Sequence, residues 1–176
     1  LVLIALKDAA LLGEEFLEKL KAEKAEAAKA EGNSFYDSGN FDKAVASYLA
    51  AAKLAPKDAL IYNNLGAAYV SMGRNSEAAE SFRKSLALKA GDGDALFNLG
   101  IAENALEKYA EAAAALKEAL ATKQDWPEAH NALGDAYLGL NRYEDAAKSY
   151  EEVVRLQPDN VNAFSNLGFA YDQLGM

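Results

Sequence analysis

A glycine recurs every 34 residues along this chain, and this repeat limits the folds that the chain can adopt. Glycine inside a helix costs about 1 kcal/mol relative to alanine, so each occurrence needs a structural reason. Close approach of a neighbouring helix is the simplest reason. The five glycines are Gly32, Gly66, Gly100, Gly134 and Gly168. The same step is kept by Ala44, Ala78, Ala112 and Ala146 and by Leu65, Leu99, Leu133 and Leu167. A period of this length predicts stacked helix pairs.

The repeat divides the chain into helix–turn–helix units. These are residues 25–58, 59–92, 93–126 and 127–160, with 161–176 as the first helix of a truncated fifth unit. Helical spacing is clear in the second unit, where Tyr62, Leu65 and Tyr69 share one face. Proline or glycine between units is followed by an Asp or Asn that can cap the next helix. No segment has the alternation of a strand, so we expect an all-α chain.

Composition excludes several classes of function. The net charge of −9 opposes binding to phosphate backbones and anionic membranes. The chain has no cysteine, and its single histidine, His130, has no second histidine for a metal site. Acidic pairs such as Glu151 and Glu152 lack a nucleophile and a base in a shielded pocket. We therefore predict no catalytic residues, no cofactor and no metal, and we expect a protein that is not an enzyme.

The repeated residues resemble the tetratricopeptide repeat (TPR) pattern. The second unit matches it with Tyr62, Leu65, Gly66, Tyr69, Ala78, Phe82 and Ser85. The third unit departs most, because Glu103 replaces an aromatic residue, Glu107 the turn glycine and Gln124 the proline. Its alanine-rich stretch also predicts thinner packing there. The resemblance covers residues 25–176. It implies a right-handed α-solenoid, a superhelix whose first helices line a concave groove that binds a protein or peptide.

Helical spacing then selects the residues that face this groove. Asparagine offers two donors and an acceptor, so a series of asparagines can bind an extended peptide backbone. Such a ladder is similar to the one in the repeat arm of O-linked N-acetylglucosamine transferase, while apolar neighbours would supply side-chain pockets. Chance enrichment of asparagine on solvated helices is the competing interpretation. The predicted groove residues are Lys29, Asn33, Asn63, Asn64, Asp94, Phe97, Asn98, Ile101, Asn131, Asp135, Asn166 and Phe169.

Three functions are compatible with this groove. The first is a scaffold or adaptor in a larger assembly that binds an extended peptide or helix of a partner. The second is a co-chaperone-like adaptor for Hsp70 or Hsp90 tails, because Lys29, Asn33 and Asn64 match half of the family's carboxylate clamp. Asp94 and Asn98 stand where the remaining cations belong. The third is the substrate-recruiting arm of a larger enzyme. A purely architectural role, with the groove unused, is a further alternative.

Charge near the groove favours one kind of partner. Its acids are Glu26, Asp37, Asp94, Glu128, Asp135 and Asp172, against Lys29 alone. We therefore expect a neutral or basic segment in preference to an acidic one, although these acids also follow the overall composition. Trp126 is expected to staple its helix onto the preceding unit in preference to anchoring a partner. His130 is expected to be packed or half-exposed.

The two ends of the chain are the least regular parts. Residues 1–24 are expected to form an N-terminal helix that covers the first unit, docks on a partner or is the remnant of a membrane anchor. Membrane contact is open only through the apolar residues 1–12, which are too few to span a bilayer alone. At the other end, Phe164, Leu167 and Tyr171 lack a covering helix, so further repeats or a partner are expected there. Charge and composition favour the cytoplasm or an organelle matrix.

Overall fold

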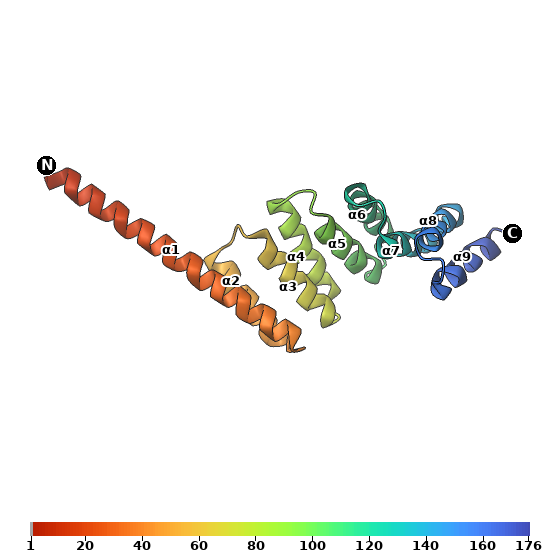
Figure 1. Ribbon diagram of the computed structural model, residues 1–176, viewed down its shortest axis with the longest axis horizontal. Coiled ribbons are helices and arrows are strands. Elements are labelled where there is room, and N and C mark those ends of the chain that lie inside the picture. Colours follow the sequence, from red (N-terminus) through yellow and green to blue (C-terminus); the bar gives the residue numbers. More distant parts are fainter. Residues whose placement is uncertain (1) are drawn as a thin grey trace.

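The computed structural model describes the backbone of residues 2–176 and the side chains of residues 11–176. Its regular elements over this range are helices that follow one another in a stack (Figure 1). Their bounds are α1 Val2–Asp37, α2 Phe41–Leu54, α3 Ala59–Ser71, α4 Asn75–Leu88, α5 Gly93–Ala105, α6 Tyr109–Thr122, α7 Pro127–Gly139, α8 Tyr143–Leu156 and α9 Val161–Gln173. The expected all-α solenoid is confirmed.

The glycine column is explained by ring contacts inside each helix pair. A Cβ atom built on Gly66 would lie 2.6 Å from the Phe82 ring, and one on Gly134 would lie 2.5 Å from the Tyr150 ring. The other two complete pairs place Tyr48 and Leu116 in the same way against Gly32 and Gly100. The close neighbour is therefore a large side chain of the second helix, 16 residues further along the chain. Gly168 has nothing within 4 Å.

Turns within the helix pairs also follow the repeat. Gly39 and Gly73 have positive φ angles, which glycine adopts at little cost. The equivalent residues of the third and fourth pairs are Glu107 and Asn141, with φ of 58° and 56°. Both pairs therefore make the same left-handed turn without glycine. Because a side chain is strained in this conformation, Glu107 is a local weak point in its hairpin.

Helix capping accounts for most junctions between pairs. The side chains of Asp58, Asp92 and Asn160 accept a hydrogen bond from a backbone N–H in the first turn of α3, α5 and α9. The junction before α7 differs from the expectation of an acidic cap. There Pro127 starts the helix, and Asp125 forms an ion pair with Arg155 at 3.0 Å. Proline at this position needs no partner for a missing N–H, so the helix starts without a side-chain cap.

The buried side chains form two clusters that meet in the third unit. One contains Tyr48, Phe82 and Leu99, and the other contains Leu116 and Tyr150. The alanines of the conserved step, Ala44, Ala78, Ala112 and Ala146, are all fully buried. The division falls in the alanine-rich unit, where small side chains fill less of the space between helices. This agrees with the thinner packing expected from the sequence.

Helix α1 extends well beyond the stack that its C-terminal part joins (Figure 1). Leu12 and Phe16 are 66% and 67% exposed, and the first buried residue along the described side chains is Ala25. The described part of residues 1–24 therefore does not cover the first unit, because the helix runs straight on and carries its side chains away from the stack. The side chains of residues 1–10, on which membrane contact was predicted, lie outside the described residues.

The described residues also contain no helix with the length and apolar character needed to cross a membrane. Within the same part of the chain, no group of three or more His, Cys, Asp or Glu side chains is arranged to hold a metal ion.

Candidate functional site

We call the surface formed by residues 25–37 of α1 and by α3, α5, α7 and α9 the first-helix surface. Its helices contact one another directly, with α1 beside α3, α3 beside α5 and α5 beside α7. No comparable contact joins successive second helices in the described part of the stack. The stack is therefore tighter on the first-helix side, and this side is the concave one. Two hollows lie on it.

The first hollow has a volume of about 270 Å³ and lies between the first and second units. The Tyr48 hydroxyl donates to Asn33 Oδ1 at 2.8 Å, and the Asn64 amide donates to the same oxygen at 3.0 Å. Both lone pairs of the Asn33 oxygen are thereby engaged, while its NH₂ group keeps its two donors. The pKa of Tyr48 is raised to about 12, chiefly by burial and then by Asp37. Tyr48 therefore stays protonated and keeps Asn33 in place.

The second hollow has a volume of about 380 Å³ and lies between the third and fifth units. Asn166 donates to Asn131 Oδ1 at 3.2 Å, and Asn131 donates to Asp135 Oδ2 at 3.2 Å. On the other side of the carboxylate, the buried Tyr150 hydroxyl donates to Asp135 Oδ1 at 2.6 Å. The apolar wall of the hollow includes Phe97 and Ile101.

The Asp135 carboxylate is partly enclosed although the residue as a whole is exposed. Burial raises its pKa, and the hydrogen bond from Tyr150 opposes this shift. The pKa of Tyr150 is raised by burial first and by Asp135 second. At neutral pH the pair consists of a neutral phenol that donates to a carboxylate. The carboxylate therefore adds a fixed negative charge to the second hollow.

Tyr48 and Tyr150 are groove-shaping residues that the sequence analysis treated only as core. Each lies 16 residues after a glycine and reaches past it to a polar residue of the first helix, Asn33 or Asp135. The signal was present in the sequence: units with Tyr at this position carry Asn or Asp one residue after the glycine. Phe82 has no hydroxyl, and its unit carries Ala67 in the corresponding place.

The predicted asparagine series is divided into two bonded pairs. Asn64 is joined to Asn33, and Asn166 to Asn131, while no bond from the Asn98 side chain joins these pairs in the described structure. Asn98 and Asn63 are half-buried, and the buried Asn63 Oδ1 has no hydrogen-bond partner among the described residues. The predicted ladder is thus discontinuous, with its gap in the third unit.

The apolar and charged residues of the prediction are distributed differently. Phe97 packs on Trp126 with ring centroids 4.7 Å apart, so Trp126 staples its helix onto the preceding unit as expected. Phe169 is exposed on α9, and Asp94 is exposed in the first turn of α5. His130 is half-buried, and its Nε2 lies 2.9 Å from the Gln124 carbonyl oxygen.

Lys29 is already paired inside the protein. Its Nζ atom lies 2.7 Å from Glu26 and 3.1 Å from Asp58, and its side chain is only 13% exposed. The hydrogen bond from Glu26 is the main cause that raises the pKa of Lys29. An acidic tail would have to displace both carboxylates to reach this ammonium group. The half of a carboxylate clamp seen in the sequence is therefore neutralised in the structure.

Comparison with protein-family models gives matches over most of the chain. A model described as TPR repeat matches residues 32–73 and 134–175, and a model described as Tetratricopeptide repeat matches residues 70–136. A comparison with curated proteins finds no match.

Solved structures give the same fold. The crystal structure of MamA protein is similar with a TM-score of 0.84 and 26% identity over 87% of this chain and 84% of that one. YrrB, described as a TPR protein with an unusual peptide-binding site, has a TM-score of 0.76 and 25% identity over 82% and 75%. The first TPR of Spaghetti (RPAP3), bound to the HSP90 peptide SRMEEVD, has a TM-score of 0.65 and 27% identity over 68% and 94%.

Proposed function

Because the chain belongs to the tetratricopeptide repeat family, we propose that it is a non-enzymatic scaffold that binds an extended segment of another protein on its first-helix surface. Neighbours in fold include a peptide-bound structure, which supports a protein-interaction role. The observation that carries the proposal is the pair of positioned amide groups in each hollow. An extended backbone presents alternating donors and acceptors that these amides can match.

The unused hydrogen-bonding capacity of the first hollow supports this role. Asn33 uses its oxygen for two internal bonds, so its NH₂ group can donate to a peptide carbonyl. Asn64 uses one N–H and keeps its second N–H and its oxygen. Because Tyr48 holds Asn33 from beneath, little side-chain entropy is lost on binding, which favours affinity.

Charge on the same surface supports a neutral or basic segment. Asp94 and Asp135 are exposed there, while Lys29 is paired with two carboxylates. Phe97 and Ile101 would receive an apolar side chain of the bound segment in the second hollow. An Hsp70- or Hsp90-type acidic tail fits this surface poorly, because it would meet Asp94 where the clamp requires a cation.

The test uses peptides selected from a random 12-residue library on the intact chain. The Asn64→Ala, Asn166→Ala double variant removes one amide from each hollow, and binding of a selected peptide should weaken about tenfold or more, as expected for lost hydrogen bonds. Its thermal unfolding midpoint should change little, because both bonds lie near the surface. The matched control is Lys117→Ala with Lys148→Ala, both exposed on second helices.

Two outcomes would count against the proposal. Unchanged peptide affinity in the double asparagine variant, measured by calorimetry, would remove these hollows from the binding site. Tight binding of the peptide SRMEEVD, which the RPAP3 structure contains, would favour the acidic-tail alternative instead.

A further inference from the structure

A second group of acidic side chains lies outside the first-helix surface. It lines a cleft of about 430 Å³ between the second and third units, with contributions from α4, α5 and α6. The cleft combines an apolar wall with three carboxylates. These residues are Leu86, Leu96, Leu99, Glu103, Glu111 and Glu118.

Glu103 is the unusual member of this group. It occupies the position of the repeat that holds Tyr69 in the second unit and Tyr137 in the fourth. The residue is only 3% exposed, and its Oε1 accepts a hydrogen bond from Arg83 Nη2 at 2.6 Å. The buried Oε2 has no hydrogen-bond partner among the described residues. Burial raises the pKa of this carboxyl, although the pairing with Arg83 lowers it. A half-paired buried carboxylate costs free energy that the usual aromatic residue would not cost.

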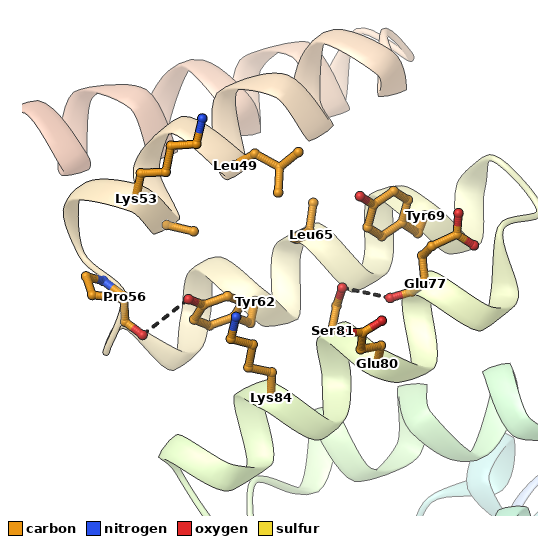
Figure 2. Close-up of a pocket in the computed structure, with 11 residues that line it drawn as sticks. Leu49, Lys53, Pro56, Tyr62, Leu65, Tyr69, Glu77, Glu80, Ser81 and Lys84 are labelled. Carbon is orange, nitrogen blue, oxygen red and sulfur yellow. Dashed lines mark hydrogen bonds between the residues drawn. The ribbon is translucent and has the colours of Figure 1, made fainter.

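The equivalent cleft one unit earlier is a comparison within the same molecule. It has a volume of about 440 Å³ and includes Tyr69 and Lys84 where the acidic cleft has Glu103 and Glu118. Figure 2 shows Lys84 beside Tyr62, and the lysine Nζ lies 4.6 Å from the ring centroid. The architecture of the two clefts is therefore the same. The residue changes alone make the second cleft acidic.

We propose that the acidic cleft receives a lysine or arginine side chain of a protein partner, at a site separate from the first-helix surface. The methylene stem would pack on Leu96 and Leu99, as long cationic side chains do along apolar surfaces. The charged head would donate to the Glu103 carboxylate, whose Oε2 lacks a partner, with Glu118 at the rim. Charge-assisted bonds of this kind are strong where water is excluded.

Two cations of the protein act on the same carboxylate. Arg83 is bonded to Oε1, and its side chain is 49% exposed, so its guanidinium does not close the cleft. Lys108 acts on Glu103 only through its charge, and Glu111 opposes it in the same way. Arg83 is therefore the internal competitor of an incoming cation. This relation makes the proposal testable in both directions.

The first experiment uses n-pentylamine as a probe and 1-pentanol as its neutral control. We expect methyl NMR shifts at Leu96 and Leu99 with the amine and not with the alcohol. Leu65, in the equivalent cleft, should show no amine-specific shift. The Glu103→Tyr variant restores the aromatic residue of the repeat, so it should fold and bind the amine at least about tenfold more weakly. Glu118→Gln, an exposed change, should weaken binding by a smaller factor.

The second experiment separates binding from a purely structural ion pair. Arg83→Ala frees Oε1, so the amine should bind several-fold more tightly than to the unchanged protein. A purely structural pair would instead give lower stability and no amine binding. Absence of amine-specific shifts in the unchanged protein, or equal binding by Glu103→Tyr, would overturn the proposal. The Asn64→Ala, Asn166→Ala variant should bind the amine normally, so failure of the first-helix site would be distinguishable.

Discussion

Replacement of Gly134 and of Gly168 by alanine should change stability in opposite directions, although the two glycines occupy the same position of the repeat. A Cβ on Gly134 would meet Tyr150 ring carbons at 2.5, 2.7 and 2.9 Å. A Cβ on Gly168 would meet no atom within 4 Å. Both residues lie inside helices, so alanine brings the same helix propensity to each. The difference between the variants therefore isolates the ring contact.

The expected magnitudes follow from these distances. Alanine in place of an interior helical glycine gains about 1 kcal/mol. At Gly134 the ring must retreat by about 0.9 Å to reach ordinary contact, and overpacking of this kind costs about 1–3 kcal/mol. The Tyr150 hydroxyl is bonded to Asp135, so the retreat also strains a hydrogen bond worth about 1 kcal/mol. We expect a net loss of about 1–3 kcal/mol for Gly134→Ala and a gain of about 0.5–1 kcal/mol for Gly168→Ala.

The assay combines urea unfolding, followed by far-ultraviolet circular dichroism, with hydrogen exchange of individual helices. Because each unit contacts only its neighbours, the gain at Gly168 should appear as slower exchange in α9. The loss at Gly134 should appear as faster exchange in α7 and α8. A Gly134→Ala variant as stable as the unchanged protein would refute the explanation of the glycine column. So would a Gly168→Ala variant that is less stable.

Three further predictions address single residues. Glu107→Gly should stabilise the protein by about 1 kcal/mol in urea unfolding, because Glu107 has a φ of 58° that glycine adopts without strain; no change would remove the strain argument. Asp58→Ala should cost about 1 kcal/mol, since Asp58 caps α3 and also pairs with Lys29, and an unaltered unfolding midpoint would contradict both roles. Burial raises the pKa of Glu103 above 4.5 despite Arg83, so this residue loses stabilising effect as the pH rises from 4.5 through the raised pKa. Urea midpoints at acidic and neutral pH should show this loss in the unchanged protein and not in Glu103→Gln, and parallel pH profiles would contradict it.

Much of the fold was predictable because each unit is a local structure. Helix boundaries depend on caps and turns that are visible in the sequence, such as Asp58, Asp92 and Asn160. The small residues of the repeat indicated close packing before any contact was known. The junction at Asp125 was the exception, because its ion pair with Arg155 joins residues 30 positions apart.

The candidate site was less predictable, because its chemistry depends on contacts between units. Spacing identified Asn33, Asn64, Asn131 and Asn166 as residues of one surface. It did not indicate that they form two bonded pairs or that Lys29 is neutralised by Glu26 and Asp58. These contacts depend on side-chain rotamers and on the angle between neighbouring helices, neither of which follows from periodicity.

The sequence by itself determined the helical hairpin, its length and the order in which hairpins stack, because these depend on helix propensity, capping and a repeated apolar face. Only the tertiary structure decided which polar groups retain free donors and acceptors. A hydrogen bond requires two groups to meet within a fraction of an ångström, and residues such as Glu103 and Arg83 do so only after two units have packed. The pattern therefore specified the scaffold, and the packing specified what remains available to a partner.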